Sequence, residues 1–283
     1  MPDLNEIIVK KVQRSERYGF LSGFFKARES LFLCLSDLNS LAQAFEMEDL
    51  MNLLSGKRYA GAIHRQADPR DFENALWEVY FEELKVARQY LDDPYLTTYL
   101  TYFHSIIFSQ EEIAYDEIAQ KQFDQRLSYW VALSSKGTPF TRELSAYAVD
   151  RFNITELFRS RIHQKDEYPF YPHGNLPKSS LEALFDSRFQ HLSKEILFSR
   201  WHAFFDNEKA YKSLSFELIL RFEYFWLDLI DSLLESPMRE PYGINYILAY
   251  FLTFMLEIES IKRHYLRLKF GLPSYWMKEG SGR

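Results

Sequence analysis

Long stretches of helical periodicity with few helix-breaking residues constrain the fold of this chain most strongly. The clearest stretch is 242–270, where apolar residues recur three or four positions apart. Gly271 and Pro273 follow it as a stop signal, and we expect Pro241 to occupy its first turn. The 283 residues include only ten glycines and ten prolines, and alternation of apolar and polar residues never persists. The pattern predicts an all-α fold.

A short polar residue followed by proline is typical of a helix start, because the side chain caps the helix and the proline needs no N–H there. This pair occurs at Asp68-Pro69, Asp93-Pro94 and Thr138-Pro139. It predicts helices that begin at 69, 94 and 139. Ser179 with Glu182 has the spacing of a capping box and predicts a further start. The proline-containing segment 165–178 before it is the longest expected loop.

Cellular placement is constrained by three features of the sequence. The uncharged apolar run from Tyr242 to Leu256 stops at Glu257, short of the roughly 20 residues that a membrane span needs. Cys34 is the only cysteine, so no internal disulfide is expected. The first residues carry acidic side chains and no apolar core typical of a secretory signal. We therefore expect a soluble or peripheral protein.

Negative charge is concentrated in one part of the chain. Segment 65–135 holds thirteen Asp and Glu against six Lys and Arg, whereas the whole chain has a formal net charge of −6. This balance disfavours nucleic acid as a partner, because phosphates would be repelled. The acidic side chains are either solvated helix faces or a surface that docks on a basic partner. For the second interpretation the candidate contact residues are Glu111, Glu112, Asp116 and Glu117.

Basic residues gather at the end of the last periodic segment, at Lys262, Arg263 and Arg267. Cations at this place stabilise the negative end of a helix, which is one interpretation. The other is that they contact an acidic partner surface or lipid headgroups.

Motifs for chemistry are missing from the sequence. No glycine-rich phosphate-binding motif occurs, and the seven histidines lack the spacing of a helical metal site. Glu78, Glu82 and Glu83 could be paired carboxylates, but Glu78 and Glu82 are one helical turn apart and indicate an exposed face. We therefore predict no catalytic, cofactor-binding or metal-binding residue and no small-molecule substrate. An all-α enzyme with an unrecognised polar site stays open as an alternative.

Two segments of the chain are weakly similar to each other. Asn153–Arg159 can be aligned with Glu257–Arg263, which also places Leu144 on Leu248. Each segment has an isoleucine followed by a branched residue three positions later and an arginine five positions later. Amphipathic helices often agree this well by chance, so the alternatives are coincidence and a repeated helical unit.

The chain resembles the C/d-subunit family of V-type ATPases along most of its length, with motifs of low information. The similar residues are Tyr246–Tyr250, Glu257-Ile258, Arg263 and Gly271-Leu272-Pro273 at the end, Asn153-Ile154, Leu157, Arg159, His173–Leu176 and Ser179–Leu181 in the middle, and Tyr18–Arg28, Leu31, Arg58-Tyr59 and Asp71–Leu76 near the start. One departure is that Glu257-Ile258 replaces the Asn-Ile pair in the final helix, which suggests a divergent member or an accessory relative.

The resemblance implies three similar helical units in a socket- or funnel-shaped body, placed here at 1–95, 96–195 and 196–283. It implies a non-catalytic subunit that links the central rotor stalk to the membrane proteolipid ring for ion transport. Such a subunit lies peripherally on the cytoplasmic side of a membrane. A helical scaffold or adaptor outside a rotary ATPase is the alternative that the sequence leaves open.

Overall fold

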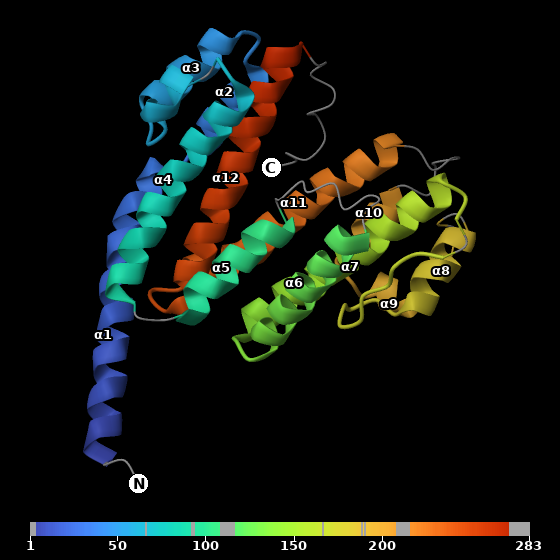
Figure 1. Cartoon of the computed structure of the whole chain (residues 1–283), viewed down its shortest axis with the longest axis horizontal. Helices are drawn as coiled ribbons and strands as arrows, with labels where there is room; N and C mark the ends of the chain where they lie inside the picture. Colours follow the sequence, from blue (N-terminus) through green and yellow to red (C-terminus); the bar gives the residue numbers. More distant parts are fainter. Residues whose placement is uncertain are drawn as a thin grey trace. The chain divides into compact units, whose positions relative to one another are not determined.

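The computed structural model describes residues 4–65, 67–91, 94–107, 117–165, 167–187, 189, 191–207 and 216–271, with side chains described for these except 4–15, 35, 94, 117–120 and 216. The regular elements among the described residues are all helices, with no strand, which confirms the predicted all-α class (Figure 1). The elements are α1 (Leu4–Arg28), the 3₁₀ turn η1 (Glu29–Leu31), α2 (Leu35–Gln43), α3 (Met47–Ser55), the 3₁₀ turn η2 (Ala60–Arg65), α4 (Pro69–Tyr90), α5 (Pro94–Ile107), α6 (Glu117–Ser135), α7 (Pro139–Ile162), α8 (Lys178–Asp186), α9 (Lys194–Leu197), α10 (His202–Asn207), α11 (Phe216–Arg239) and α12 (Ile244–Phe270).

Two of the predicted caps are present. The Asp68 carboxylate accepts the backbone N–H groups of Arg70 and Asp71, at 2.8 and 3.1 Å, at the start of α4. The Thr138 hydroxyl accepts the N–H of Thr141, at 3.3 Å, at the start of α7. In both helices the next residue is the predicted proline. Local sequence therefore determines where these helices begin. Asp93 lies outside the described residues.

The capping box predicted at Ser179 is wrong. Helix α8 begins at Lys178, and Pro177 precedes it without a side-chain cap. The neighbouring hydroxyl of Ser180 donates instead to the Glu195 carboxylate, at 3.1 Å, and thus ties α8 to the first turn of α9. The expected loop does lie here, between the end of α7 at Ile162 and α8.

The start of α12 is also later than expected. Pro241 lies before the helix, which begins at Ile244 after Gly243. Gly243 has a φ of 126°, which a residue with a Cβ rarely adopts, and its N–H donates to the Ser22 hydroxyl of α1, at 3.2 Å. This turn redirects the chain before the helix can start. The predicted stop is confirmed, because Gly271 is left-handed with a φ of 63°.

The chain divides into two compact units. Unit 1 comprises Met1–Glu111 with Leu234–Lys278, and unit 2 comprises Glu112–Leu233 with Glu279–Arg283. These boundaries differ from the expected division at 95 and 195. The reason is that α12 packs against α1, α3, α4 and α5, so that the end of the chain completes a unit begun by its first hundred residues.

Unit 1 is built around α12, which is buried along most of its length. Its aromatic side chains contact those of the surrounding helices, with ring centroids 5.1 Å apart for Phe25 and Phe251 and 5.6 Å apart for Tyr80 and Phe254. Near its end, Tyr265 stacks on Phe72 of α4 at 4.2 Å. Such pairs contribute roughly 0.5–1.5 kcal/mol beyond burial of their area. The unit thus has an interlocked aromatic core.

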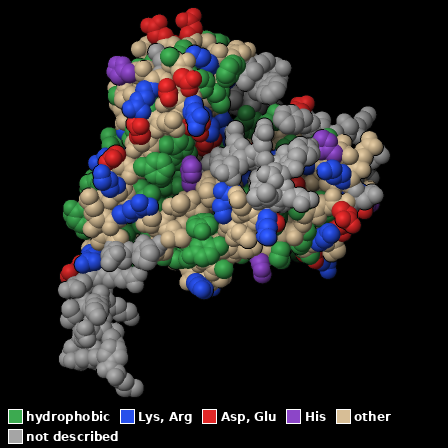
Figure 2. All heavy atoms as spheres, in the orientation of Figure 1, with side chains coloured by type: hydrophobic (Ala, Val, Ile, Leu, Met, Phe, Trp, Pro, Cys, Tyr) green, Lys and Arg blue, Asp and Glu red, His purple; other side chains and the backbone are tan. Residues whose placement is uncertain are grey.

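By length and composition α12 is the one described helix that could cross a membrane. The uncharged run that ends at Leu256 covers only the first part of this helix, which continues with charged residues from Glu257. However, 72% of the apolar window is buried within the protein, as in the core helix of a soluble domain. On the face drawn in Figure 2, hydrophobic side chains form small groups separated by charged and polar ones.

Unit 2 is organised around α7, which lies beside α6 (Figure 1). Its aromatic core joins α7, α11 and the residue before α10. The rings of Trp201 and Phe222 lie 5.3 Å apart, and Phe158 lies 5.6 Å from Phe222. Trp201 also stacks on Trp226 at 6.0 Å. Fifteen residues of α7 are buried, including Asp150 and Asn153.

Candidate functional site

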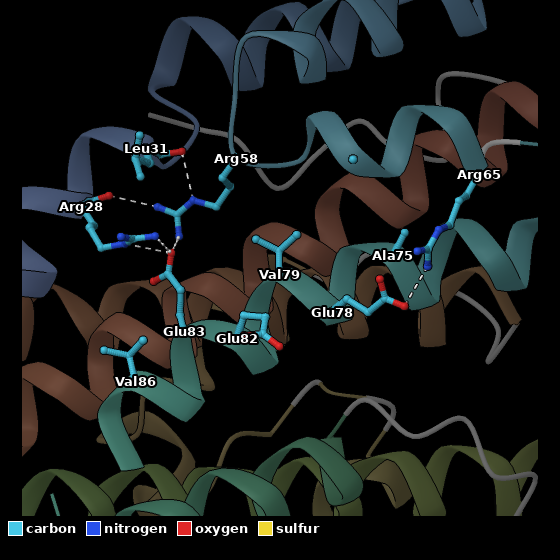
Figure 3. A pocket seen from close by; sticks show the side chains of 11 residues that line it. Arg28, Leu31, Arg58, Arg65, Ala75, Glu78, Val79, Glu82, Glu83 and Val86 are labelled. Carbon is cyan, nitrogen blue, oxygen red and sulfur yellow. Dashed lines mark hydrogen bonds and ion pairs between the residues drawn. The ribbon is translucent and has the colours of Figure 1, made fainter. Parts of the chain in front are cut away.

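A buried ion-pair cluster lies in unit 1 where α1, α4 and α12 meet the loop after α3. The Glu83 carboxylate of α4 accepts the Arg58 Nη1 at 3.3 Å and the Arg28 Nη2 at 3.1 Å (Figure 3). The Tyr250 hydroxyl of α12 donates to the other carboxylate oxygen. The side chains of Arg58 and Glu83 are only 4% and 5% exposed. The cluster therefore joins four segments through one buried carboxylate.

All three guanidinium nitrogens of Arg58 donate hydrogen bonds in this cluster. Its Nη2 donates to the Arg28 carbonyl at 3.0 Å and its Nε to the Leu31 carbonyl at 3.3 Å. Its guanidinium lies 4.4 Å from the ring centroids of both Phe32 and Phe254. A planar guanidinium can form this fork and stack at once, whereas a lysine cannot. The side chain thus holds the turn after α1 against α4 and α12.

A second buried carboxylate of unit 1 lies on α12. Glu257 accepts the Tyr59 hydroxyl at 2.6 Å and the backbone N–H of Leu33. Burial raises the pKa of Glu257, and burial likewise raises the pKa of Tyr59. These bonds fasten the segment between η1 and α2 to the central helix, because a buried carboxylate without donors would be costly.

A groove of about 600 Å³ lies beside the ion-pair cluster (Figure 3). Its apolar part is formed by Leu31, Ala75, Val79 and Val86. Charged side chains line the rest. Arg65 pairs with Glu78 at 2.8 Å, Arg28 and Arg58 pair with Glu83, and Glu82 pairs with Lys85 outside the groove. Among the described residues no group of three or more His, Cys, Asp or Glu could hold a metal ion.

A third buried carboxylate, Asp150, lies on α7 in unit 2. It accepts the Trp201 Nε1–H at 3.1 Å, the Asn175 amide at 3.1 Å and the Leu176 backbone N–H at 2.9 Å. Burial is the largest influence and raises the pKa of Asp150 to about 6. Gly174 packs directly against this carboxylate. Asp150 therefore holds the loop before α8 to the aromatic core.

The raised pKa of Asp150 should be visible in the pH dependence of the free energy of unfolding. Its pKa of about 6 in the folded protein exceeds the ordinary 3.8, so the folded state binds the proton more tightly and loses stability as the pH rises from about 4 to 6. Relative to Asp150→Asn, the wild-type protein should gain about 2–3 kcal/mol of unfolding free energy between pH 7 and pH 4. Urea unfolding of both proteins across this range measures the difference, and parallel profiles would contradict the assignment.

Asn153, one turn along α7 from Asp150, holds the same loop. Its side-chain oxygen accepts the Tyr171 N–H at 2.7 Å, and its amide donates to the Tyr171 carbonyl at 2.9 Å. Asn153 aligns with Glu257 in the internal similarity of the sequence. Both side chains are buried, and both accept a backbone N–H from outside their helix: Asn153 from Tyr171 in the following loop, and Glu257 from Leu33, more than two hundred positions away. The two central helices thus carry a corresponding polar anchor at the aligned position.

The predicted partner-contact residues are distributed as follows. Glu111, Glu112 and Asp116 lie outside the described residues, and Glu117 begins α6 without a described side chain. Arg263 is half-buried on α12.

Lys262 and Arg267 are buried inside unit 1. The Lys262 ammonium lies 2.7 Å from Glu259 and 3.0 Å from Glu73 of α4. Arg267 donates to the Ala44 carbonyl after α2. Their contacts within unit 1 are those of structural ties, and a partner contact at these positions stays a prediction. Glu78 and Glu82 are exposed as expected, with side chains 60% and 76% accessible.

Sequence reasoning missed Arg58, Tyr250 and Asp150 as site residues, and it considered Glu83 only as one of three possible paired carboxylates. The sequence did contain a signal for the two acids, Glu83 and Asp150, because each lies at helical spacing from the apolar residues of its helix. Glu83 falls between the buried Tyr80 and Ala87 along α4. An acid at such a position is buried and must find donors. The identity of the donors could not be read, because they come from distant segments.

Comparison with protein-family models gives no match for this chain, and comparison with curated proteins gives none either.

Proposed function

We propose that the chain is a non-catalytic coupling subunit of a V-type rotary ATPase, linking the central rotor stalk to the membrane proteolipid ring. The observation that carries the proposal is the correspondence between α7 and α12. Asn153 and Glu257 occupy aligned positions, are both buried and both accept a backbone N–H from outside their own helix. Such correspondence supports a repeated helical unit, which the resemblance to the C/d-subunit family implies.

The packing of each unit agrees with a role in carrying torque. A coupling body must resist deformation, and close-packed interiors have low compressibility. In unit 1 the Glu83 cluster joins four segments, and in unit 2 Asp150 joins α7, the following loop and Trp201. Under this proposal the protein is peripheral on the cytoplasmic side of the membrane and supports ion transport without chemistry of its own.

Co-purification is the direct test. The tagged full-length chain should isolate with V-type stalk and proteolipid subunits from detergent-solubilised membranes of its source cells. A helical scaffold or adaptor outside a rotary ATPase is the second candidate, favoured by the apolar groove with paired charges beside α4. Capture of other proteins without any stalk or proteolipid subunit would support the scaffold and contradict the coupling role.

Charge reversal tests the predicted contact surface. Changing Glu111, Glu112, Asp116 and Glu117 to lysine should weaken assembly with the stalk or ring, because charge complementarity fixes register and partner choice. We expect at least a tenfold loss in a pull-down, which corresponds to about 1.4 kcal/mol. The matched control reverses four exposed acids in other places, Glu143, Glu182, Asp186 and Glu235. Equal recovery of both variants would remove this surface from the proposal.

A further inference from the structure

Helix α11 passes from one unit into the other without interruption. It runs from Phe216 to Arg239, whereas unit 2 ends at Leu233 and unit 1 resumes at Leu234. A regular helix across such a boundary would join the two units stiffly, because each of its turns is closed by backbone hydrogen bonds. Around the boundary, however, α11 contains a residue that interrupts this regular hydrogen bonding.

Pro237 lies inside α11, four residues after Leu233. Proline has no N–H, so the carbonyl of Leu233 cannot receive its usual intrahelical bond, and the ring crowds that same carbonyl. Proline also disfavours the helical conformation of the preceding residue, here Ser236. The missing bond therefore falls at the last residue of unit 2.

Leu233 and Leu234 are themselves buried, 5% and 1% exposed, but two neighbouring features act on the helix backbone here. The Ser232 hydroxyl donates back to the Leu229 carbonyl at 2.8 Å, a bond of the kind that often bends helices. The ion pair that spans the proline, Glu235 with Arg239 at 3.3 Å, has side chains 48% and 81% exposed. An exposed pair of this spacing contributes only about 0.3–0.5 kcal/mol. It cannot replace the backbone bond.

We propose that α11 is a hinge at Leu233–Pro237 about which the two units reorient. The carbonyl that lacks its donor and the boundary between the units coincide, so bending at this point breaks no backbone hydrogen bond to Leu233. Prolines elsewhere in the fold, such as Pro69 and Pro139, begin helices, where no bond is lost. This proposal does not rest on the coupling function, because it concerns the isolated chain.

Spin-label distances test the hinge. In a Cys34→Ser background, cysteines replace the exposed Glu82 of unit 1 and Ser135 of unit 2. Pro237→Ala restores the N–H toward Leu233 and should narrow the distribution of distances between the labels. Pro139→Ala is the matched control and should leave the width unchanged. An unchanged width in Pro237→Ala, or equal narrowing in both variants, would overturn the hinge.

Hydrogen exchange gives a second measurement that needs no labels. Pro237→Ala should slow the exchange of the amides of residues 238 and 239 about fivefold, the factor expected for one net backbone hydrogen bond of about 1 kcal/mol. Amides of α12 in the same protein should not change. Unaltered exchange at 238 and 239 would contradict the proposal.

Discussion

Replacing Arg58 by methionine should lower the free energy of unfolding by about 3–5 kcal/mol, because it removes one partner of a buried ion pair. The substitution deprives the Glu83 carboxylate of the donor 3.3 Å away and leaves the carbonyls of Arg28 and Leu31 without its N–H groups. It also removes the cation between the rings of Phe32 and Phe254. Chemical denaturation followed by circular dichroism measures the loss.

The control for this experiment is Arg65→Met. Arg65 pairs with Glu78 at 2.8 Å, but the two side chains are 46% and 60% exposed. Breaking such a pair should cost no more than about 1 kcal/mol. Arg58→Lys should recover only part of the lost stability, because an ammonium cannot form the fork and stack together. Equal effects of Arg58→Met and Arg65→Met would show that the buried cluster does not hold unit 1 together.

Replacing Gly174 by alanine should destabilise unit 2 by about 2–4 kcal/mol, through overpacking and the disruption of buried hydrogen bonds. An added Cβ would lie 2.2 Å from the Asp150 Oδ1 and 3.3 Å from the Asp150 backbone nitrogen. The carboxylate cannot move aside freely, since it is held by Trp201, Asn175 and Leu176. Tryptophan fluorescence during urea unfolding reports on this region through Trp201.

A double-mutant cycle separates this clash from other effects of the alanine. In an Asp150→Ala background the carboxylate is absent, and Gly174→Ala should cost markedly less. Gly61→Ala is the matched glycine control, because a Cβ there would have no heavy atom within 4 Å. The same cost for Gly174→Ala with and without Asp150 would rule out the close packing as its cause.

The helix boundaries that sequence predicted correctly are those decided by neighbouring residues. Asp68, Thr138 and Gly271 act on backbone groups within one turn, so their roles follow from local chemistry. The start of α12 was misplaced because Gly243 bonds Ser22, a residue more than two hundred positions away. Ser179 was misread because α8 begins at Lys178, which places Ser179 inside the first turn and not at the cap.

The buried polar sites could be anticipated only in part. Glu83, Asp150 and Glu257 each interrupt an apolar stripe, which indicates a buried acid. Their donors come from elements far apart in the chain, and periodicity carries no information on which segments meet. The burial that raises the pKa of Asp150 likewise depends on Trp201 and the loop around Gly174.

By itself, the sequence determined that this protein is all-α and where several helices begin and end, because helical propensity, capping and periodicity act over a few residues. The tertiary structure decided which helices share a core. It placed α12 among the first helices and divided the chain into two units. It also decided that Lys262 and Arg267 are buried, because exposure depends on what packs over a side chain and not on its own charge.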